Sequence, residues 1–285
     1  MRPPVDHIEA PAFPPRLPWI NTDPLRMDQQ LGRPVLVEFW DFCRPNSIRT
    51  LPYLTAWHER YHAAGLVVIG VHSAGFAPGA TPRVVKQAVA RLGIAYPVLV
   101  DSALEVWHEY DNLGWPARYL FGRDGMLHEY HFGEGAYAET ERTIQELLGL
   151  GAERDLPAPD VLAPVRPEDA PDAVLAVQSD DVAGPYSGPY EAGEVWAVLE
   201  PCDGAPAAER VVRAVAWADS GTADAGTADG GTADGGTAVE TVLTVEHPGA
   251  HRLIAHETST SGELSLEVGG GVVCHAVCFT PGLAH

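Results

Sequence analysis

The chain has 285 residues, a length that predicts two domains at roughly 100–200 residues each. Its composition, 46% hydrophobic and 20% charged, is typical of a globular protein, and no apolar run approaches the ~20 residues of a membrane-spanning helix. The 18 basic and 39 acidic side chains give a net charge of -21, which repels phosphate backbones and anionic lipid. Neither nucleic acid nor a membrane is therefore an expected partner.

The acidity is concentrated in the second half of the chain. Residues 1–155 hold 14 basic and 19 acidic side chains, whereas residues 156–285 hold 4 and 20, which indicates a boundary near residue 155. The first 18 residues contain six prolines and no apolar stretch of the kind found in secretory signals. Four cysteines in so long a chain do not suggest a disulfide scaffold, and the protein is expected in the cytoplasm.

The first half alternates strand-like and helix-like segments. Short apolar, β-branched runs at 35–40 and 66–71 predict central parallel strands, and apolar residues at helical spacing over 48–61 predict a helix between them, with Pro52 as a kink. A helix over 81–92, a strand at 97–100 and a helical segment over 102–110 follow. Strands at 117–121 and 126–131 around a glycine-containing turn predict a hairpin, and a helix over 139–148 ends the series. This order predicts an α/β domain with a mixed central sheet and helices on both faces.

The second half of the chain has a different pattern, with strand-like segments and no convincing helix. Residues 151–172 are rich in Pro, Ala and acidic residues and predict a linker. Beyond it, strand-like runs at 194–199, 210–217, 239–245, 252–256 and 263–268 come without a convincing helix, so residues 173–285 are expected to form a small acidic all-β sandwich. Residues 220–238 repeat Gly-Thr-Ala-Asp with a period of five and predict a flexible insert. An N-terminal extension over residues 1–16 precedes the first domain, which spans 17–150.

A motif with chemical meaning follows the first strand, where the chain reads Val35-Leu-Val-Glu-Phe-Trp-Asp-Phe-Cys-Arg-Pro-Asn-Ser-Ile-Arg-Thr-Leu-Pro-Tyr-Leu54. This segment, together with Trp115-Pro-Ala-Arg-Tyr-Leu120, resembles thioredoxin-like redoxin domains of the TlpA and DipZ type over about residues 17–150. The resemblance implies a thioredoxin-like fold, a role in thiol-disulfide exchange and cell redox homeostasis, protein or small-molecule thiols and disulfides as partners, and no cofactor. The C-terminal residues 278–282 resemble, more weakly, the β-sandwich appended to DipZ proteins.

The resemblance also implies site residues. Aligned without gaps, the two redox cysteines of the family fall on Arg44 and Ser47, so the dithiol pair is missing and Cys43 is the only nearby thiol. A lone thiol can attack a disulfide but cannot resolve the mixed disulfide without help. In a monothiol site, Arg44 and the start of a helix would favour the Cys43 thiolate, and Glu38 would stand where the family has a buried acid that transfers a proton.

The same resemblance assigns the substrate groove. It places Trp40, Trp115 and Pro116 along that groove, with the Trp115–Pro116 bond in the cis form.

The residues also bear on two other protein classes, zinc proteases and peroxidases. His58-Glu-Arg-Tyr-His62 matches a zinc-protease motif, but the next ligand position falls on Val68 in a predicted core strand, so no metal site is expected. A peroxidase needs only one activated thiolate, yet the Pro-x-x-x-Thr-x-x-Cys arrangement of that family is absent around Cys43. Two functions remain open. The first is a monothiol oxidoreductase, and the second is a redox-inactive binding module whose β-sandwich recognises a carbohydrate or a protein.

Overall fold

The computed structural model describes residues 7–151, 158–218 and 238–285, which divide into two compact units, Met1–Pro171 and Asp172–His285. The predicted insert over residues 220–238 lies outside the described residues apart from Ala238. No helix in the described part of the chain is long and apolar enough to cross a membrane.

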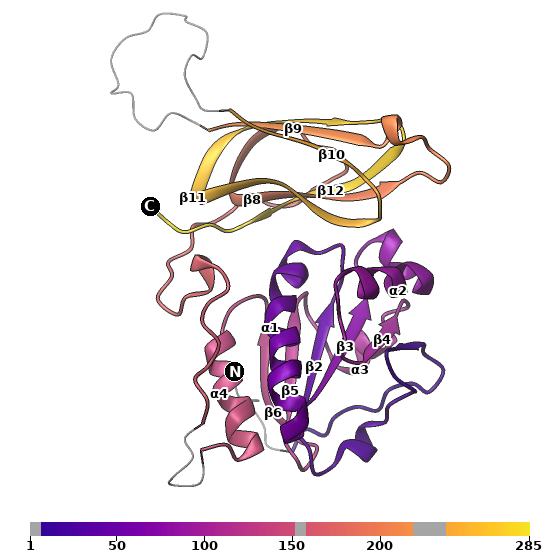
Figure 1. Ribbon diagram of the computed structural model, residues 1–285, viewed down its shortest axis with the longest axis vertical. Helices are drawn as coiled ribbons and strands as arrows, with labels where there is room; N and C mark the ends of the chain where they lie inside the picture. Colours follow the sequence, from indigo (N-terminus) through magenta and orange to yellow (C-terminus); the bar gives the residue numbers. More distant parts are fainter. Residues whose placement is uncertain (1–6, 152–157, 219–237) are drawn as a thin grey trace, which may run out of the picture. The chain divides into compact units, whose positions relative to one another are not determined.

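The first unit is built on a six-stranded mixed sheet in the order β1-β4-β3-β2-β5-β6 (Figure 1). β2 is parallel to β3 and β3 to β4, whereas β2 and β5 are antiparallel, as are β5 and β6. The thioredoxin-like α/β fold predicted from the sequence is confirmed. The strands are β1 (Trp19–Ile20), β2 (Val35–Trp40), β3 (Val67–Ser73), β4 (Val98–Asp101), β5 (Ala117–Phe121) and β6 (Leu127–Phe132).

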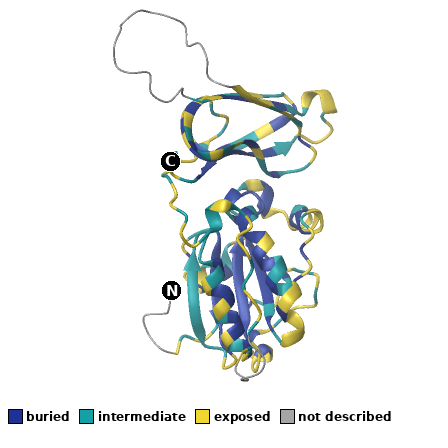
Figure 2. Cartoon of the chain, turned by 60° about the vertical axis from the view of Figure 1, so that its left-hand side comes forward, coloured by how far each residue is buried: buried dark blue, intermediate teal, exposed yellow. Residues whose placement is uncertain are grey.

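The central strands are apolar on both sides because helices cover both faces of the sheet. All six residues of β2 are buried, whereas the edge strand β6 is only half-buried (Figure 2). One face packs Val37 and Phe39 against Val106 and Tyr110 of the α3 region. On the other face, the guanidinium of Arg118 lies over Trp57 of α1 and Tyr137 of α4. The helices are α1 (Pro45–Tyr61), α2 (Pro82–Arg91), α3 (Glu105–Glu109) and α4 (Tyr137–Leu148).

Residues 158–169, part of the segment predicted as a linker, lie along α1 and α4. The Leu162 N–H donates to Glu141 Oε2 at 2.7 Å, and the Val165 N–H donates to Tyr53 Oη at 2.7 Å. The Arg166 guanidinium reaches the Arg49 carbonyl at 2.7 Å. We refer to residues 158–169 as the strap.

The second unit is an all-antiparallel β structure, as predicted, whose strands form one hydrogen-bonded sheet in the order β10-β9-β11-β8-β12-β7. The two strands expected at 252–256 and 263–268 are a single strand of 20 residues, β11, with register shifts that interrupt its pairing to β8. The separation was wrong because the strand continues through the polar residues 257–262, with pairing to β8 resuming at Thr260. The strands are β7 (Val182–Ala183), β8 (Gly188–Pro201), β9 (Val211–Ala218), β10 (Ala238–Thr244), β11 (Gly249–Val268) and β12 (Val272–Thr280).

Candidate active site

The loop between β2 and α1 brings the sequence-predicted residues to the start of a long helix. β2 ends at Trp40, and α1 begins at Pro45, whose fixed φ suits the first helical position. Arg44 is the N-cap, with an extended backbone, and its N–H donates to the Asp41 carbonyl at 2.9 Å. Cys43 therefore lies two residues before the first turn of a 17-residue helix, where unpaired N–H groups favour negative charge.

The Cys43 side chain is completely buried. All four cysteines lie within the described residues, and none is joined to another by a disulfide. Burial lowers the pKa of Arg91 on α2, whereas the charge of Cys43 raises it, so a Cys43 thiolate and the Arg91 guanidinium interact electrostatically. The sequence pattern did not reveal this charge interaction between Cys43 and Arg91.

Asp41 organises the loop and was not among the predicted site residues. Its carboxylate is fully buried, accepts the Cys43 N–H at 2.9 Å and the Gly75 N–H at 2.8 Å, and lies 3.3 Å from His72 Nε2. These contacts join the loop after β2 to the loop after β3. The signal in the sequence is an aspartate between two aromatic residues at the end of an apolar strand, where only a hydrogen-bonded carboxylate can be buried.

Arg44 lies over the aromatic side of the site. Its Cζ is 4.7 Å from the centroid of the Phe76 ring and 4.8 Å from that of Trp115. A Cβ at Gly75 would stand 3.0 Å from Arg44 Nε and 3.1 Å from Asp41 Oδ2, so the space beside these two groups accommodates only glycine without a shift. Arg44, the expected counterpart of the family's first redox cysteine, thus places a cation against two aromatic rings.

The groove residues are only partly accessible. The Trp115–Pro116 bond is cis, as expected, and Trp115 Nε1 donates to the Ser73 carbonyl at 2.8 Å. Trp40, by contrast, is fully buried with its ring edge-on to His72, so its side chain does not line an accessible groove in this structure. Ser47 is also buried, and its Oγ accepts the Asp41 N–H at 3.2 Å.

Glu38 occupies the middle of β2 and is completely buried. Neither carboxyl oxygen has a hydrogen-bond partner among the described residues. Burial raises the pKa of Glu38 to about 8, against the opposing effect of Arg118, which faces it across the strand pair. At neutral pH this carboxyl group is therefore largely protonated and can donate a proton.

The zinc-protease motif does not assemble a metal site. The rings of His58 and His62 stack at 5.2 Å between centroids, and His62 Nδ1 lies 3.0 Å from the His58 carbonyl oxygen. Among the residues that the structure describes, no group of three or more His, Cys, Asp or Glu side chains could hold a metal ion.

The chain is similar to several known proteins. The AhpC/TSA family model matches residues 9–130. Protein DipZ of Mycobacterium tuberculosis is 34% identical over 164 residues, a match that covers 56% of this chain and 24% of DipZ. The chain therefore spans about a quarter of the length of that relative. Thiol-disulfide oxidoreductase YkuV of Bacillus subtilis is 25% identical over 131 residues, which are 46% of this chain and 87% of YkuV.

A thiol-disulfide isomerase from Corynebacterium glutamicum has a solved structure that is similar to the first unit, with a TM-score of 0.45 and 24% sequence identity. The superposition covers 49% of this chain and 96% of that one. Residues 9–130 thus match the AhpC/TSA family model, and the chain is similar in sequence to a thiol-disulfide oxidoreductase.

Proposed function

We propose that the first unit is a monothiol redox protein in which Cys43 is the reacting group. The observation that carries the proposal is the placement of Cys43 directly before α1. A favourable charge interaction with Arg91 supports it. A helix N-terminus and a nearby cation both stabilise a thiolate, which is the nucleophilic form of cysteine. Partners would be thiols, disulfides or proteins that carry them.

The proposed reaction needs one external thiol. The Cys43 thiolate attacks one sulfur of a substrate disulfide, forms a mixed disulfide and releases the other sulfur as a thiolate. A low-molecular-weight thiol then attacks the substrate sulfur of the mixed disulfide, which returns Cys43 as a thiolate and yields a new disulfide. Glu38, protonated below about pH 8, would supply a proton to a departing thiolate, and Arg44 would hold the substrate chain beside Pro116.

Because Cys43 is buried, the loop over residues 41–44 must open before a substrate reaches the sulfur. Asp41 is the group that holds this loop closed, since its carboxylate binds the N–H groups of both Cys43 and Gly75. The rate of exchange is therefore expected to depend on opening as well as on the thiolate fraction.

The test is the pH dependence of iodoacetamide labelling of the native protein, mapped to each cysteine by mass spectrometry. The proposal expects Cys43 to label with a midpoint below the reference of ~8.5 for a free thiol. Arg91→Gln should raise that midpoint, whereas Arg83→Gln, on an exposed position of the same helix, should not. Incubation with oxidised glutathione should form a mixed disulfide at Cys43 in wild type, identified by mass spectrometry apart from any adduct at exposed Cys202 that Cys43→Ser would also carry.

A second candidate is favoured by the burial itself. Cys43 is inaccessible in the closed loop, as expected of a binding module without redox activity. That candidate predicts that Cys43 stays unlabelled until the protein is denatured, while exposed Cys202 labels normally. Slow labelling of this kind, together with no mixed disulfide, would contradict the redox proposal.

Two finer points belong to the proposal as well. The C-terminal unit would recognise a carbohydrate or a protein ligand, and pull-down on immobilised glycans against protein extracts would separate these two ligand classes.

A cytoplasmic location is supported by four cysteines without a disulfide among them, because a reducing compartment keeps thiols in that state. Fractionation of cells that produce the whole protein would test it.

A further inference from the structure

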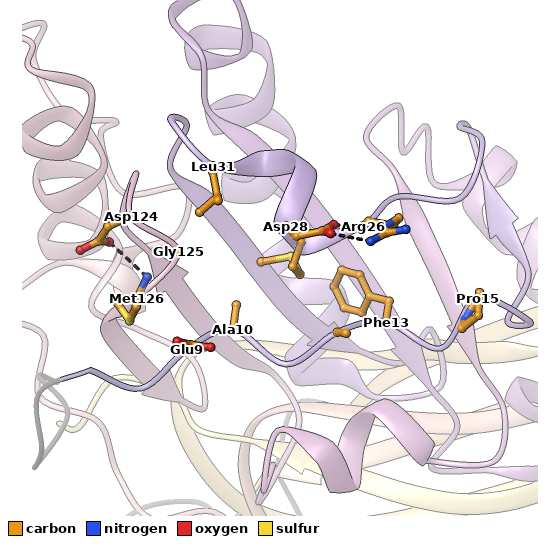
Figure 3. A pocket seen from close by; sticks show the side chains of 12 residues that line it. Glu9, Ala10, Phe13, Pro15, Arg26, Asp28, Leu31, Asp124, Gly125 and Met126 are labelled. Atoms are coloured by element: carbon orange, nitrogen blue, oxygen red, sulfur yellow. Dashed lines mark hydrogen bonds and ion pairs between the residues drawn. The ribbon is translucent and has the colours of Figure 1, made fainter.

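A cavity of about 540 Å³ opens in the first unit beside the turn between β5 and β6 (Figure 3). The N-terminal segment forms one wall because it pairs with the hairpin turn: the Ala10 N–H donates to the Gly125 carbonyl at 3.1 Å, and the Leu127 N–H donates to the Ile8 carbonyl at 2.7 Å. The short helix Met27–Gln30 forms the opposite wall. The lining residues are Glu9, Ala10, Ala12, Phe13, Pro15, Arg26, Met27, Asp28, Leu31, Asp124, Gly125 and Met126.

The cavity and the redox site lie at opposite ends of the same two strands. Leu31 precedes β2, and Asp124 follows β5, whereas Trp40 and Ala117 end those strands at the redox site. Six residues of β2 at ~3.3 Å each separate the two places by about 20 Å. A ligand in the cavity would therefore not touch Cys43.

The inner walls of the cavity are apolar and fixed. Phe13 and Met27 are buried, with 6% and 8% of their surfaces exposed. The Phe13 ring stacks on Tyr110 at 6.1 Å and meets Trp19 edge-on at 5.4 Å, so its position is set by the core. Leu31 is 60% exposed at the mouth, which leaves apolar surface for a ligand to cover. A volume of this size is typical of small-molecule sites.

The charge around the mouth is negative. Arg26 is already matched by Asp28, with contacts of 3.0 Å from Nε and 2.5 Å from Nη2 to the two carboxylate oxygens. Two further carboxylates line the cavity, those of exposed Glu9 and Asp124, of which Asp124 accepts the Met126 N–H at 3.1 Å. Among the described residues, no second cation lines the cavity. Carboxylates beside low-dielectric walls raise the local concentration of cations.

We propose that this cavity binds a small apolar molecule that carries one organic cation, such as an aryl-alkyl amine. Its apolar body would cover Phe13, Met27 and Leu31, and its ammonium group would lie near Glu9 and Asp124. Nothing in the proposed redox reaction requires this site, so it represents a separate binding function of the first unit.

The composition of the chain offers a direct readout. Only three methionines occur, and two of them, Met27 and Met126, line the cavity. The full chain labelled with [¹³C-methyl]methionine should give three methyl signals, assigned with Met27→Leu and Met126→Leu. Phenethylamine, phenethyl alcohol and 3-phenylpropionate are the probes, because they share one ring and differ in charge.

The proposal expects phenethylamine to shift the Met27 and Met126 signals and to bind about fivefold or more tightly than phenethyl alcohol, with 3-phenylpropionate the weakest. Glu9→Gln should weaken the amine by about two- to fivefold and leave the alcohol unchanged. Higher salt should weaken only the amine. Ala10→Phe, which fills the cavity, should abolish all three.

Equal affinity for the three probes would overturn the charge argument. An absence of shifts at Met27 and Met126 at about 10 mM of every probe would overturn the site itself. Circular dichroism of Glu9→Gln and Ala10→Phe establishes that both variants are folded. Glu9→Gln alters an exposed surface residue, so its folded state is expected to match that of wild type.

Discussion

Glu38 is a carboxyl group whose ionisation is strongly altered by the fold. It is fully buried, has no hydrogen-bond partner for its carboxyl oxygens among the described residues, and has its pKa raised from 4.5 to about 8. In the unfolded chain the carboxyl group ionises near pH 4.5, whereas in the folded protein it keeps its proton up to about pH 8. Unfolding therefore releases a proton between these values, and the free energy of unfolding falls as pH rises through this range.

We expect the free energy of unfolding of Glu38→Gln to increase relative to that of wild type as pH rises. Each pH unit between 4.5 and 8 costs the wild type roughly 1.4 kcal/mol at this position, and glutamine does not titrate. From pH 5 to pH 7.5 the difference in free energy of unfolding should change by roughly 3 kcal/mol in favour of the variant. Urea unfolding at both pH values measures it. A difference that is independent of pH would show that Glu38 ionises normally in the folded state.

Some features of the site could be predicted from the sequence, and others could not. The burial of Glu38 and the cis bond before Pro116 are confirmed, because an apolar strand and a family motif define both positions locally. Asp41 and Arg91 were missed because their roles depend on partners that lie elsewhere in the chain, such as Gly75, 34 residues away. Local patterns carry no information on which distant groups face each other.

At the scale of elements, the strap shows how a segment without periodicity can be ordered. The Arg166 guanidinium donates to the Arg49 carbonyl at 2.7 Å and to Asp169 at 2.7 Å, and lies 3.3 Å from Glu134. Glu134 belongs to the turn after β6 and forms an ion pair with Arg49 of α1 at 2.9 Å. Arg166 thus connects the strap to the helix that begins at the redox site.

We expect Arg166→Ala to release the strap from α1. Loss of charge-assisted hydrogen bonds in a largely buried network should cost about 2 kcal/mol of stability. The amides of Leu162 and Val165, which donate to α4 and α1 side chains, should exchange hydrogen faster. Hydrogen exchange followed by mass spectrometry over residues 158–169 measures this effect.

The matched control for this variant is Arg142→Ala, which removes an exposed arginine whose ion pair with Glu139 is 3.8 Å long. It should leave exchange in the strap unchanged. Unaltered exchange at Leu162 in Arg166→Ala would show that the remaining contacts of the strap suffice to hold it.

The predicted strand bounds were correct where burial on both faces requires apolar residues. β2 was predicted at its observed bounds because a strand covered on both faces is apolar at every position. β11 was divided in two because residues 257–262 are polar, although the backbone stays extended through them and pairs with β8 again from Thr260. The strap was predicted as a linker because its hydrogen-bond partners lie in α1 and α4 and leave no trace in its own sequence.

At the scale of the whole molecule, the two units differ most in charge. Residues 1–171 carry 15 basic and 22 acidic side chains, a net of -7, whereas residues 172–285 carry 3 and 17, a net of -14. The smaller unit thus holds twice the net charge of the larger one. Like charges on a small unit repel one another in the compact state and lower its stability at low ionic strength.

Salt should therefore stabilise the second unit more than the first. Raising NaCl shortens the distance over which charges interact, from about 10 Å at 0.1 M to about 3 Å at 1 M. For a unit of this size, each kcal/mol of repulsion removed raises the melting temperature by about 4 °C. Differential scanning calorimetry of the full chain at both concentrations measures the shift. Val71→Ala and Val198→Ala, which truncate fully buried side chains in the first and second units, identify the two transitions. If the transition that Val71→Ala lowers moves with salt as much as the other, net charge does not determine the relative stability of the two units.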